Sequence, residues 1–179
     1  MGNTNALTYK EIFKLFKENK IRTGNTNFNV GMYFYVPDSF EKYHKIENGK
    51  KMVRVSTSCW FTSLPVKKHN DEIILFKRYT PEEYPKYDNY DAIEVGSYKD
   101  IPCDYDGVMG VPITFLDKYN PEQFEIVRFR KGNDDKDLMV GGKSPYCRIL
   151  IRRKQKWGMM TEETSMPMAA EKPAEYKTK

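Results

Sequence analysis

The residues best suited to chemistry lie together in one stretch, residues 84–121, which reads YPKYDNYDAIEVGSYKDIPCDYDGVMGVPITFLDKYNP. Its tyrosines and aspartates are Tyr84, Tyr87, Tyr90, Tyr98, Tyr105 and Tyr119, with Asp88, Asp91, Asp100, Asp104, Asp106 and Asp117. Flat amphipathic rings between short hydrogen-bonding groups can stack on and read polar planar molecules, including nucleobases. In an alternative that stays open, the tyrosines cover a core edge and the aspartates cap turns. The density of both residue types favours a recognition surface.

Residue patterns typical of catalytic sites are weak in this sequence. Asp104 and Asp106 could support acid–base or magnesium chemistry, but Asp-Tyr-Asp-Gly is more typical of a turn with capped amides. A G-x-S-x-G nucleophile turn does not occur. Cys59, Cys103 and Cys147 are widely spaced without a C-x-x-C pair, which indicates buried thiols in a reducing compartment. A metal site is therefore not expected.

A basic cluster that begins in the last predicted strand and continues beyond it is the best candidate for phosphate contact. It consists of Arg148, Arg152, Arg153, Lys154 and Lys156. A solvated strand end is an equally open interpretation. The net charge of +5 comes from 30 basic against 25 acidic residues, a smaller excess than non-specific electrostatic DNA binders usually carry.

Four runs of the sequence resemble the EcoRI-type adenine-specific DNA methyltransferases. Two are central: PKYDNYDAI at residues 85–93 and DYDGVMGVPITFLDKYNP at residues 104–121. Two flank them: GNTNALTYKE at residues 2–11 and RILIRRK at residues 148–154. The resemblance therefore extends over most of the chain, and it matches only the C-terminal part of that family.

The resemblance implies duplex DNA as partner and S-adenosylmethionine as the methyl donor of the complete family enzyme. From residue type, the expected DNA-recognition surface comprises Lys86, Tyr87, Asn89, Tyr90 and the Asp104–Thr114 run, in which Asp104, Tyr105, Asp106 and Thr114 carry suitable side chains. The phosphate contacts are expected from Arg148, Arg152, Arg153 and Lys154.

The motifs needed for methyl transfer are missing from the sequence. Transfer to adenine N6 needs a glycine-rich turn after a first strand for the cofactor, and an (Asn/Asp)-Pro-Pro-(Phe/Tyr) loop for the flipped base. The chain has no Pro-Pro pair and no G-x-G, and Gly107 and Gly110 give the nearest glycine spacing. The resemblance places both motifs upstream of the matched part, so this chain alone is expected neither to bind the cofactor nor to methylate DNA. A non-enzymatic nucleic-acid-binding module and an inert remnant stay open as alternatives.

An amphipathic helix is predicted over residues 8–19. Thr8 and Glu11 have the spacing of a capping box at its start. An apolar stripe follows, formed by Ile12, Phe13, Leu15 and Phe16. In the resembled fold this stripe packs on a parallel sheet whose leading strands are not encoded here. The stripe must therefore be covered by later strands of this chain, dock onto an upstream catalytic half or self-associate, and docking or self-association is predicted.

Alternation and turn residues predict several strands. Residues 32–36 and 53–59 are expected to pair as a hairpin, with Asn48-Gly49 as a turn signal between them. Residues 73–76 are expected to form a short buried strand, and residues 124–129 a longer one. In the last strand, residues 146–151, Cys147, Ile149 and Ile151 should face inward. His69 is expected to be a solvated loop residue rather than a ligand.

These elements predict an α+β fold with a mixed, mainly antiparallel sheet and one N-terminal helix, corresponding to the C-terminal part of a Rossmann-like methyltransferase. The predicted domain spans residues 1–157, and residues 158–179 are predicted to be a disordered tail because they lack hydrophobic periodicity. A hydrophobic fraction of 39% and the absence of a long apolar run favour a cytoplasmic protein without membrane spans.

Overall fold

The computed structural model describes residues 1–28, 30–130, 137–145 and 147–154. In chain order its elements are β1 (Gly2–Asn3), the 3-10 helix η1 (Thr4–Thr8), α1 (Lys10–Lys17), β2 (Arg22–Thr23), β3 (Met32–Tyr35), β4 (Lys45–Glu47), β5 (Lys50–Val55), β6 (Ser58–Cys59), β7 (Phe61–Thr62), η2 (Lys67–His69), β8 (Lys86–Tyr87), β9 (Tyr90–Glu94), η3 (Tyr98–Asp100), β10 (Met109–Pro112), η4 (Ile113–Asp117), β11 (Phe124–Arg130) and β12 (Arg148–Arg153). The predicted tail, residues 158–179, and the end of the predicted domain lie outside the described residues. Within them, the helices are too short and polar to cross a bilayer.

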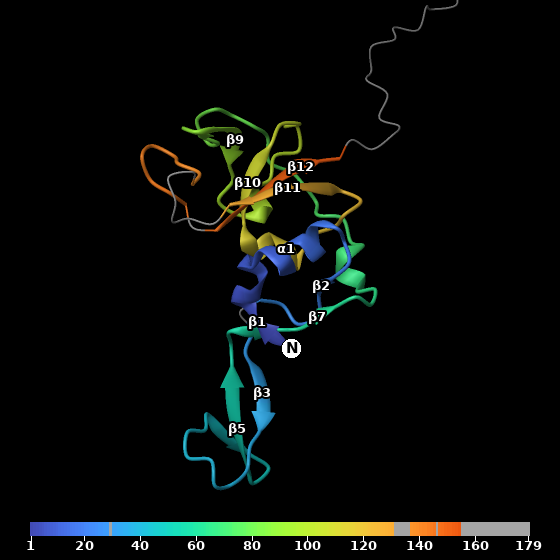
Figure 1. The fold of residues 1–179 in the computed structure, drawn as a ribbon, viewed down its shortest axis with the longest axis vertical. Helices are drawn as coiled ribbons and strands as arrows, with labels where there is room; N and C mark the ends of the chain where they lie inside the picture. Colours follow the sequence, from blue (N-terminus) through green and yellow to red (C-terminus); the bar gives the residue numbers. More distant parts are fainter. Residues whose placement is uncertain (29, 131–136, 146, 155–179) are drawn as a thin grey trace, which may run out of the picture.

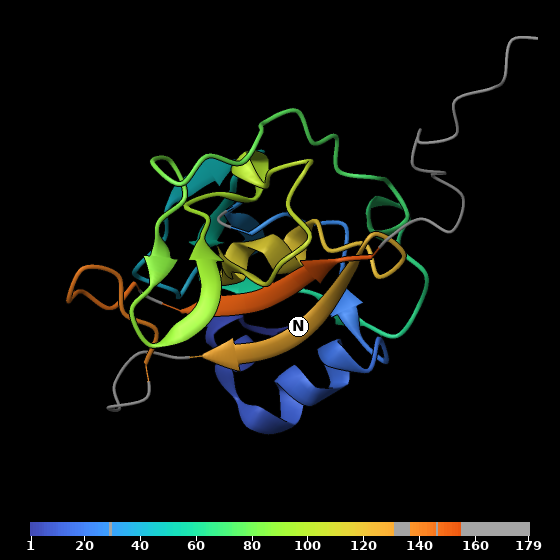
Figure 2. The same ribbon diagram turned by 90° about the horizontal axis from the view of Figure 1, so that it is seen from above.

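The body of the molecule is built on a five-stranded sheet with the order β11-β12-β10-β9-β8 (Figures 1 and 2). The β10–β9 pair is parallel, and the other neighbouring pairs are antiparallel. The prediction of an α+β fold with a mixed, mainly antiparallel sheet is therefore confirmed. Its correspondence with part of a Rossmann-like fold is compatible with this sheet and stays a prediction.

The sheet buries side chains on both faces. Ile149 and Ile151 of β12 lie in the main core, which also contains Phe115 and Phe124. Leu150 points to the opposite face and joins a smaller cluster with Tyr87, Ala92 and Leu138. Because successive residues of a strand face opposite sides, burial on both faces explains the continuous apolar run of β12. Cys147, Ile149 and Ile151 are buried as predicted, whereas Tyr146 lies outside the described residues.

The N-terminal helix is confirmed, but its start differs from the predicted capping box. Thr8 belongs to η1 and donates its hydroxyl to the carbonyl of Asn5, 2.8 Å away. α1 instead begins after Tyr9, which provides no side-chain cap. The capping-box prediction is wrong because Asn3 caps η1 one turn earlier and holds the chain in 3-10 geometry through Thr8.

The apolar stripe of α1 is covered by the chain itself. Phe13 stacks on Phe129 of β11 with ring centroids 4.8 Å apart, and Phe16 meets Phe61 edge to face at 5.8 Å. The Lys17 ammonium donates to the carbonyl of Val127 in β11 at 2.7 Å, and Figure 2 shows α1 running beside that strand. The prediction that this stripe is an open docking face is therefore wrong, since strands later in the chain bury it.

A second, three-stranded sheet with the order β3-β5-β4 extends away from the body (Figure 1). β3 and β5 pair antiparallel from Met32–Val55 to Tyr35–Met52, which confirms the predicted pairing. The predicted second strand, residues 53–59, differs, because β5 ends at Val55 and Ser58–Cys59 form β6, which pairs with β1. The added strand β4 connects to β5 through Asn48 and Gly49, with φ of 50° and 74°. This left-handed pair is the geometry that the Asn-Gly signal predicts for a two-residue turn. We call residues 31–56 the arm.

The predicted buried strand at residues 73–76 does not form. The segment is extended but pairs with no strand, and Ile74 and Phe76 are 84% and 70% exposed. The side-chain amide of Gln123 instead bonds both the N–H and the carbonyl of Ile73 at 2.8 Å. Ile73 and Leu75 pack on the main core, so the backbone is held by a side chain and only one face is buried.

Candidate nucleic-acid interface

A largely buried ion pair, whose side chains are 16% and 14% exposed, organises the second face of the main sheet. Glu94 of β9 accepts hydrogen bonds from the guanidinium of Arg148 in β12, with Nε at 2.8 and 3.0 Å from the two carboxylate oxygens and a terminal nitrogen at 2.5 Å. The Tyr87 hydroxyl donates to the same carboxylate. Burial, and then the bond to Glu94, raise the pKa of Tyr87 well above its ordinary value. Burial alone would lower the pKa of Arg148, but Glu94 outweighs it and raises that pKa.

Two glycines make room for tyrosines rather than for a cofactor. A Cβ at Gly110 would lie 2.0 Å from the Tyr87 hydroxyl, and one at Gly107 would lie 2.5 Å from the Tyr105 hydroxyl. Glycine-rich cofactor turns work because the missing side chain lets a ligand approach the backbone. Here the chain's own phenol groups occupy that space. These residues therefore do not fit the S-adenosylmethionine turn that the Gly107–Gly110 spacing superficially suggests.

The β8–β9 turn is bonded to residues 137–142. Asn89 donates its side-chain amide to the carbonyl of Asp137 and accepts from the N–H of Met139 at 3.1 Å. Asp88 accepts from the N–H of Gly142 at 3.0 Å. Asn89 thus positions residues 137–142 along one edge of the main sheet.

The Asp104–Gly107 run is also anchored by internal bonds. Asp104 accepts from the N–H of Tyr79 at 2.8 Å, so its carboxylate holds the neighbouring extended segment rather than its own turn. Asp106 pairs with a terminal nitrogen of Arg153 at 2.8 Å, and the same guanidinium donates to the carbonyl of Cys103. The Tyr105 ring packs on Tyr79 with centroids 4.7 Å apart. Both carboxylates are therefore engaged in bonds within the chain.

The structure divides the predicted contact residues into two groups. Bonds within the chain engage Tyr87, Asn89, Asp104, Asp106, Arg148 and Arg153. Of these, Asn89, Asp104 and Asp106 are also exposed to solvent. Lys86, Thr114, Arg152 and Lys154 expose their side chains, and Tyr90 and Tyr105 are half-buried. The Lys86 ammonium lies 4.0 Å from Asp91, and both side chains are largely exposed. Their roles in DNA contact stay predictions.

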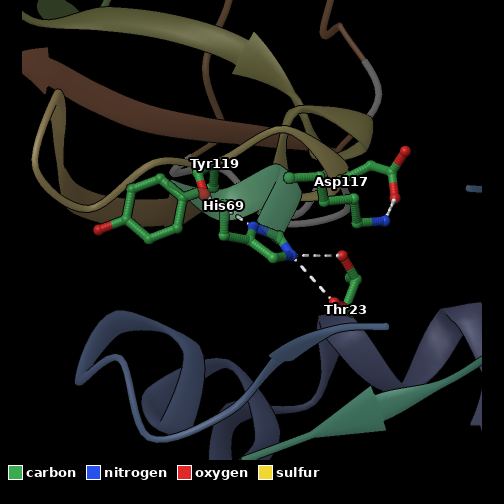
Figure 3. A network of polar contacts seen from close by, with 5 residues as sticks. Thr23, His69, Asp117 and Tyr119 are labelled. Atoms are coloured by element: carbon green, nitrogen blue, oxygen red, sulfur yellow. Dashed lines mark hydrogen bonds and ion pairs between the residues drawn. The ribbon is translucent and has the colours of Figure 1, made fainter. Parts of the chain in front are cut away.

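His69 is buried, contrary to prediction, and is 3% exposed. Figure 3 shows its ring between β2 and the loop after η4: Nδ1 lies 2.8 Å from the carbonyl of Tyr119, and Nε2 lies 3.1 Å from the Thr23 hydroxyl and 2.9 Å from the Thr23 carbonyl. Beside it, Lys68 pairs with the buried Asp117 at 2.7 Å. The prediction of a solvated loop residue failed because these partners are about 50 residues away in sequence.

The cysteines behave as structural thiols. Cys59 and Cys147 are buried, and the three thiols are unpaired. Burial, with a smaller contribution from Asp117, raises the pKa of Cys59 to about 11, so its thiol stays protonated at neutral pH. Within the described residues, no group of histidine, cysteine and acidic side chains is arranged to hold a metal ion.

Comparison of the sequence with known proteins identifies the family of the chain. The family model described as "Adenine-specific methyltransferase EcoRI" matches residues 1–154. The chain therefore belongs to the EcoRI family of adenine-specific methyltransferases, which confirms the resemblance seen in the sequence.

Curated relatives agree with this family. The chain is 50% identical over 162 residues to the Type II methyltransferase M.EcoRI of Escherichia coli, covering 87% of this chain and 49% of that protein. It is 35% identical over 179 residues to M.MgeORF184P of Mycoplasma genitalium and 34% identical over 179 residues to M.MpnI of Mycoplasma pneumoniae, covering 87% of this chain and 56% of each relative. The chain thus spans about half the length of these curated relatives. No solved structure matches it significantly.

Proposed function

We propose that this chain is the DNA-recognition portion of an adenine-specific DNA methyltransferase of the restriction–modification type. The observation that carries the proposal is the 50% identity to M.EcoRI over 49% of that enzyme, in a chain without a Pro-Pro pair or a G-x-G turn. In the complete enzyme a methyl group would pass from S-adenosylmethionine to adenine N6 in duplex DNA, in the cytoplasm. Here the chain would supply DNA contacts, and another part of the enzyme would supply the cofactor and base-flipping sites.

Ion pairs within the chain support this role, because they hold the strand that carries the candidate phosphate contacts. Glu94 holds Arg148, and Asp106 holds Arg153, which fixes the two ends of β12 against the rest of the sheet. The side chains of Arg152, in β12, and Lys154, directly after β12, are exposed at one of these ends. A rigid strand that presents cations at its end is a suitable support for phosphate contacts, because little side-chain and backbone freedom is lost on binding.

We infer that the rest of the enzyme docks on the extended segment at residues 71–80 rather than on α1. Ile74 and Phe76 are 84% and 70% exposed, while Ile73 and Leu75 anchor the segment in the main core. A cavity of about 320 Å³ lies beside them, lined in part by Tyr98 and Lys118. Exposed large apolar side chains next to a concave surface mark interaction sites.

The chain alone is expected to leave DNA unmethylated, because neither transfer motif is present in its sequence. The assay is incubation with labelled S-adenosylmethionine and mixed-sequence duplex DNA, followed by analysis for N6-methyladenine. Adding the remaining half of M.EcoRI as a separate polypeptide should restore labelling. Phe76→Asp should reduce the restored labelling at least tenfold, and Glu82→Ala, at another exposed position, should leave it unchanged.

Two results would contradict these inferences. Reproducible N6-methyladenine from the chain alone would refute the division of labour between recognition and catalysis. Full complementation by the Phe76→Asp variant would refute the docking site while leaving the recognition role intact. A chain that binds DNA but never complements would favour the alternative function, a non-enzymatic DNA-binding module.

Duplex binding should weaken as the salt concentration rises, because the cations at the end of β12 contact phosphates. Neutralising phosphates releases counterions, and each lost contact flattens the slope of log K against log salt by about 0.9. The double variant Arg152→Gln/Lys154→Gln should therefore flatten the slope by about two, as measured by fluorescence anisotropy. Arg153→Gln is the control, and its slope should change less because Asp106 already holds that guanidinium. Equal changes in both variants would place the phosphate contacts elsewhere.

A further inference from the structure

The arm carries an unusual set of exposed side chains. Figure 1 shows β3 and β5 projecting from the body, with the two short strand pairs β1–β6 and β2–β7 near their base. Tyr33 and Tyr35 are 43% and 56% exposed, although aromatic rings normally dominate cores. The arm contains five lysine and arginine residues against three acidic ones, Asp38, Glu41 and Glu47. A purely structural sheet extension does not require this combination.

The strand register places the tyrosines and three cations on one face. Tyr33 is paired with Arg54, and Tyr35 is paired with Met52, which in turn is paired with Lys45 of β4. Residues that pair directly share a face, and residues two apart on a strand share it as well. Lys50 therefore lies on the same face as Met52. We call Tyr33, Tyr35, Lys45, Lys50 and Arg54 the tyrosine face.

Side-chain contacts preorganise these cations. The Lys45 ammonium sits 4.8 Å from the centre of the Tyr33 ring, and the Lys50 ammonium sits 5.8 Å from that of Tyr35. Cation–π contacts of this length hold an ammonium over the ring while leaving it hydrated. The Arg54 side chain lies over Gly31, where an added Cβ would be 2.2 Å from its Nε. Gly31 therefore gives Arg54 the space to lie flat along this face.

The charge of the tyrosine face stays positive after its internal pairing. Glu47 shares the face and pairs with Lys45 at 3.0 Å, and both side chains are about half exposed. Its hydrogen bond raises the pKa of Lys45. Glu47 is the cross-strand neighbour of Lys50, but among the described residues no ion pair within 4.0 Å joins Lys50 or Arg54 to an acidic side chain. Two cations and two phenol hydroxyls therefore remain available to an anionic partner.

Duplex DNA matches this face in chemistry and in shape. Phosphate oxygens accept hydrogen bonds from lysine, arginine and tyrosine side chains, which are the exposed donors here. The major groove of B-DNA is about 12 Å wide and admits a two-stranded β-ribbon. The arm is two-stranded over most of its length, because β3 and β4 pair with the same residue of β5 only at Met52. A protein partner would be expected to meet an uncharged apolar centre, and charged groups are depleted at such centres. The occupant that the observations favour is therefore a DNA duplex.

We propose that the arm is a second DNA contact, a β-ribbon that enters the major groove with Lys50 and Arg54 on phosphates and the Tyr33 and Tyr35 hydroxyls facing the DNA. The proposal rests on the proposed function and adds a site that lies outside the tyrosine–aspartate stretch of residues 84–121. The arm would give the enzyme a second contact with the duplex, separate from the contacts at the end of β12.

The test measures duplex binding by the full chain as a function of salt. Lys50→Gln/Arg54→Gln should flatten the slope of log K against log salt by about two and weaken binding at least tenfold at about 0.1 M salt. Lys10→Gln/Lys99→Gln, which removes two exposed cations on α1 and η3, is the matched control and should leave the slope unchanged. Tyr35→Leu should also weaken binding, since it removes the ring that holds Lys50 and a hydroxyl donor.

Photocrosslinking tests the groove directly. Duplexes that carry 5-bromodeoxyuridine expose the bromine in the major groove, and crosslinked peptides should come from residues 32–55. A wild-type chain that fails to bind duplex DNA would overturn the proposed function, and the arm with it. Normal binding with an unchanged slope in the Lys50→Gln/Arg54→Gln variant, or crosslinks confined to other segments, would overturn the arm alone. Tighter binding of single strands than of duplex, or dimers abolished by Tyr35→Leu, would assign the face to another partner.

Discussion

Replacing Glu94 with leucine is expected to lower the free energy of unfolding by about 3 kcal/mol, the lower end of the range for breaking a buried ion pair. The Arg148 and Glu94 side chains are 16% and 14% exposed, so a guanidinium that has lost this carboxylate would stay largely cut off from water. The variant also leaves the Tyr87 hydroxyl without the acceptor it now uses. Urea unfolding measures this change in the free energy of unfolding, and the m value should equal that of the wild type.

A double-mutant cycle separates the interaction energy of the Glu94–Arg148 ion pair from the energy that each substitution costs through lost packing. Arg148→Met alone should destabilise by a similar amount, because it leaves the carboxylate buried without its cation. Glu94→Leu/Arg148→Met removes both charges and should cost less than the sum of the single variants, with a coupling energy of about 2 kcal/mol. Additive effects would mean that the two groups do not depend on each other, and that the second face of the sheet is held by Leu150 and its apolar neighbours.

Local patterns were enough to predict much of the secondary structure. The Asn48-Gly49 signal gave the correct turn because its left-handed geometry is set by those two residues alone. Alternation indicated that the two segments are strands that pair, but the second strand lies at Lys50–Val55 rather than at residues 53–59. The strands β11 and β12 were found for the same reason. These features depend on neighbours in sequence.

The errors share a different physical origin. His69 was predicted to be solvated, yet its bonds go to Thr23 and Tyr119, which no local pattern connects to it. Thr8 has the sequence of a helix cap, but an earlier cap at Asn3 determined the local geometry. In each case a partner distant in sequence, or a competing local bond, decided the outcome.

The candidate site was predicted only in part. The tyrosine–aspartate stretch was identified from its composition, but composition does not separate residues that bond within the chain from those that face solvent. Arg148 and Arg152 look alike in sequence, and only the position of Glu94 across the sheet makes the first a positioning residue. The arm was missed as a site because its tyrosines and lysines come together through strand register, not through sequence spacing.

Phe16→Glu is expected to give the largest loss of stability, more than about 4 kcal/mol. Phe16 is 2% exposed, and removal of a buried phenyl group alone costs about 3–5 kcal/mol. The introduced carboxyl group adds a desolvation cost, because the site beside Phe61 offers an aromatic edge rather than a polar partner. This is a large fraction of the stability of a typical domain, so the variant should be mostly unfolded at neutral pH.

Ile74→Glu is the matched control, since it introduces the same charge in place of another large apolar residue. Ile74 is 84% exposed, so the free energy of unfolding should change by no more than about 0.5 kcal/mol. The two variants should also differ in pH dependence. Burial would raise the pKa of a carboxyl at position 16 in the folded state, so the folded state would hold its proton while the unfolded chain releases it.

The stability of Phe16→Glu should therefore fall as pH rises above the unfolded pKa of about 4.3, by up to about 1.4 kcal/mol per pH unit. Ile74→Glu should follow the wild type over the same range. Chemical denaturation between pH 4 and pH 7 measures both. If Phe16→Glu stayed folded, became more soluble and showed the wild-type pH profile, the stripe of α1 would be an open interface. Its burial against β11 and β7 predicts instead that the folded chain needs Phe16, and that the exposed segment at Ile74 is the face left for a partner.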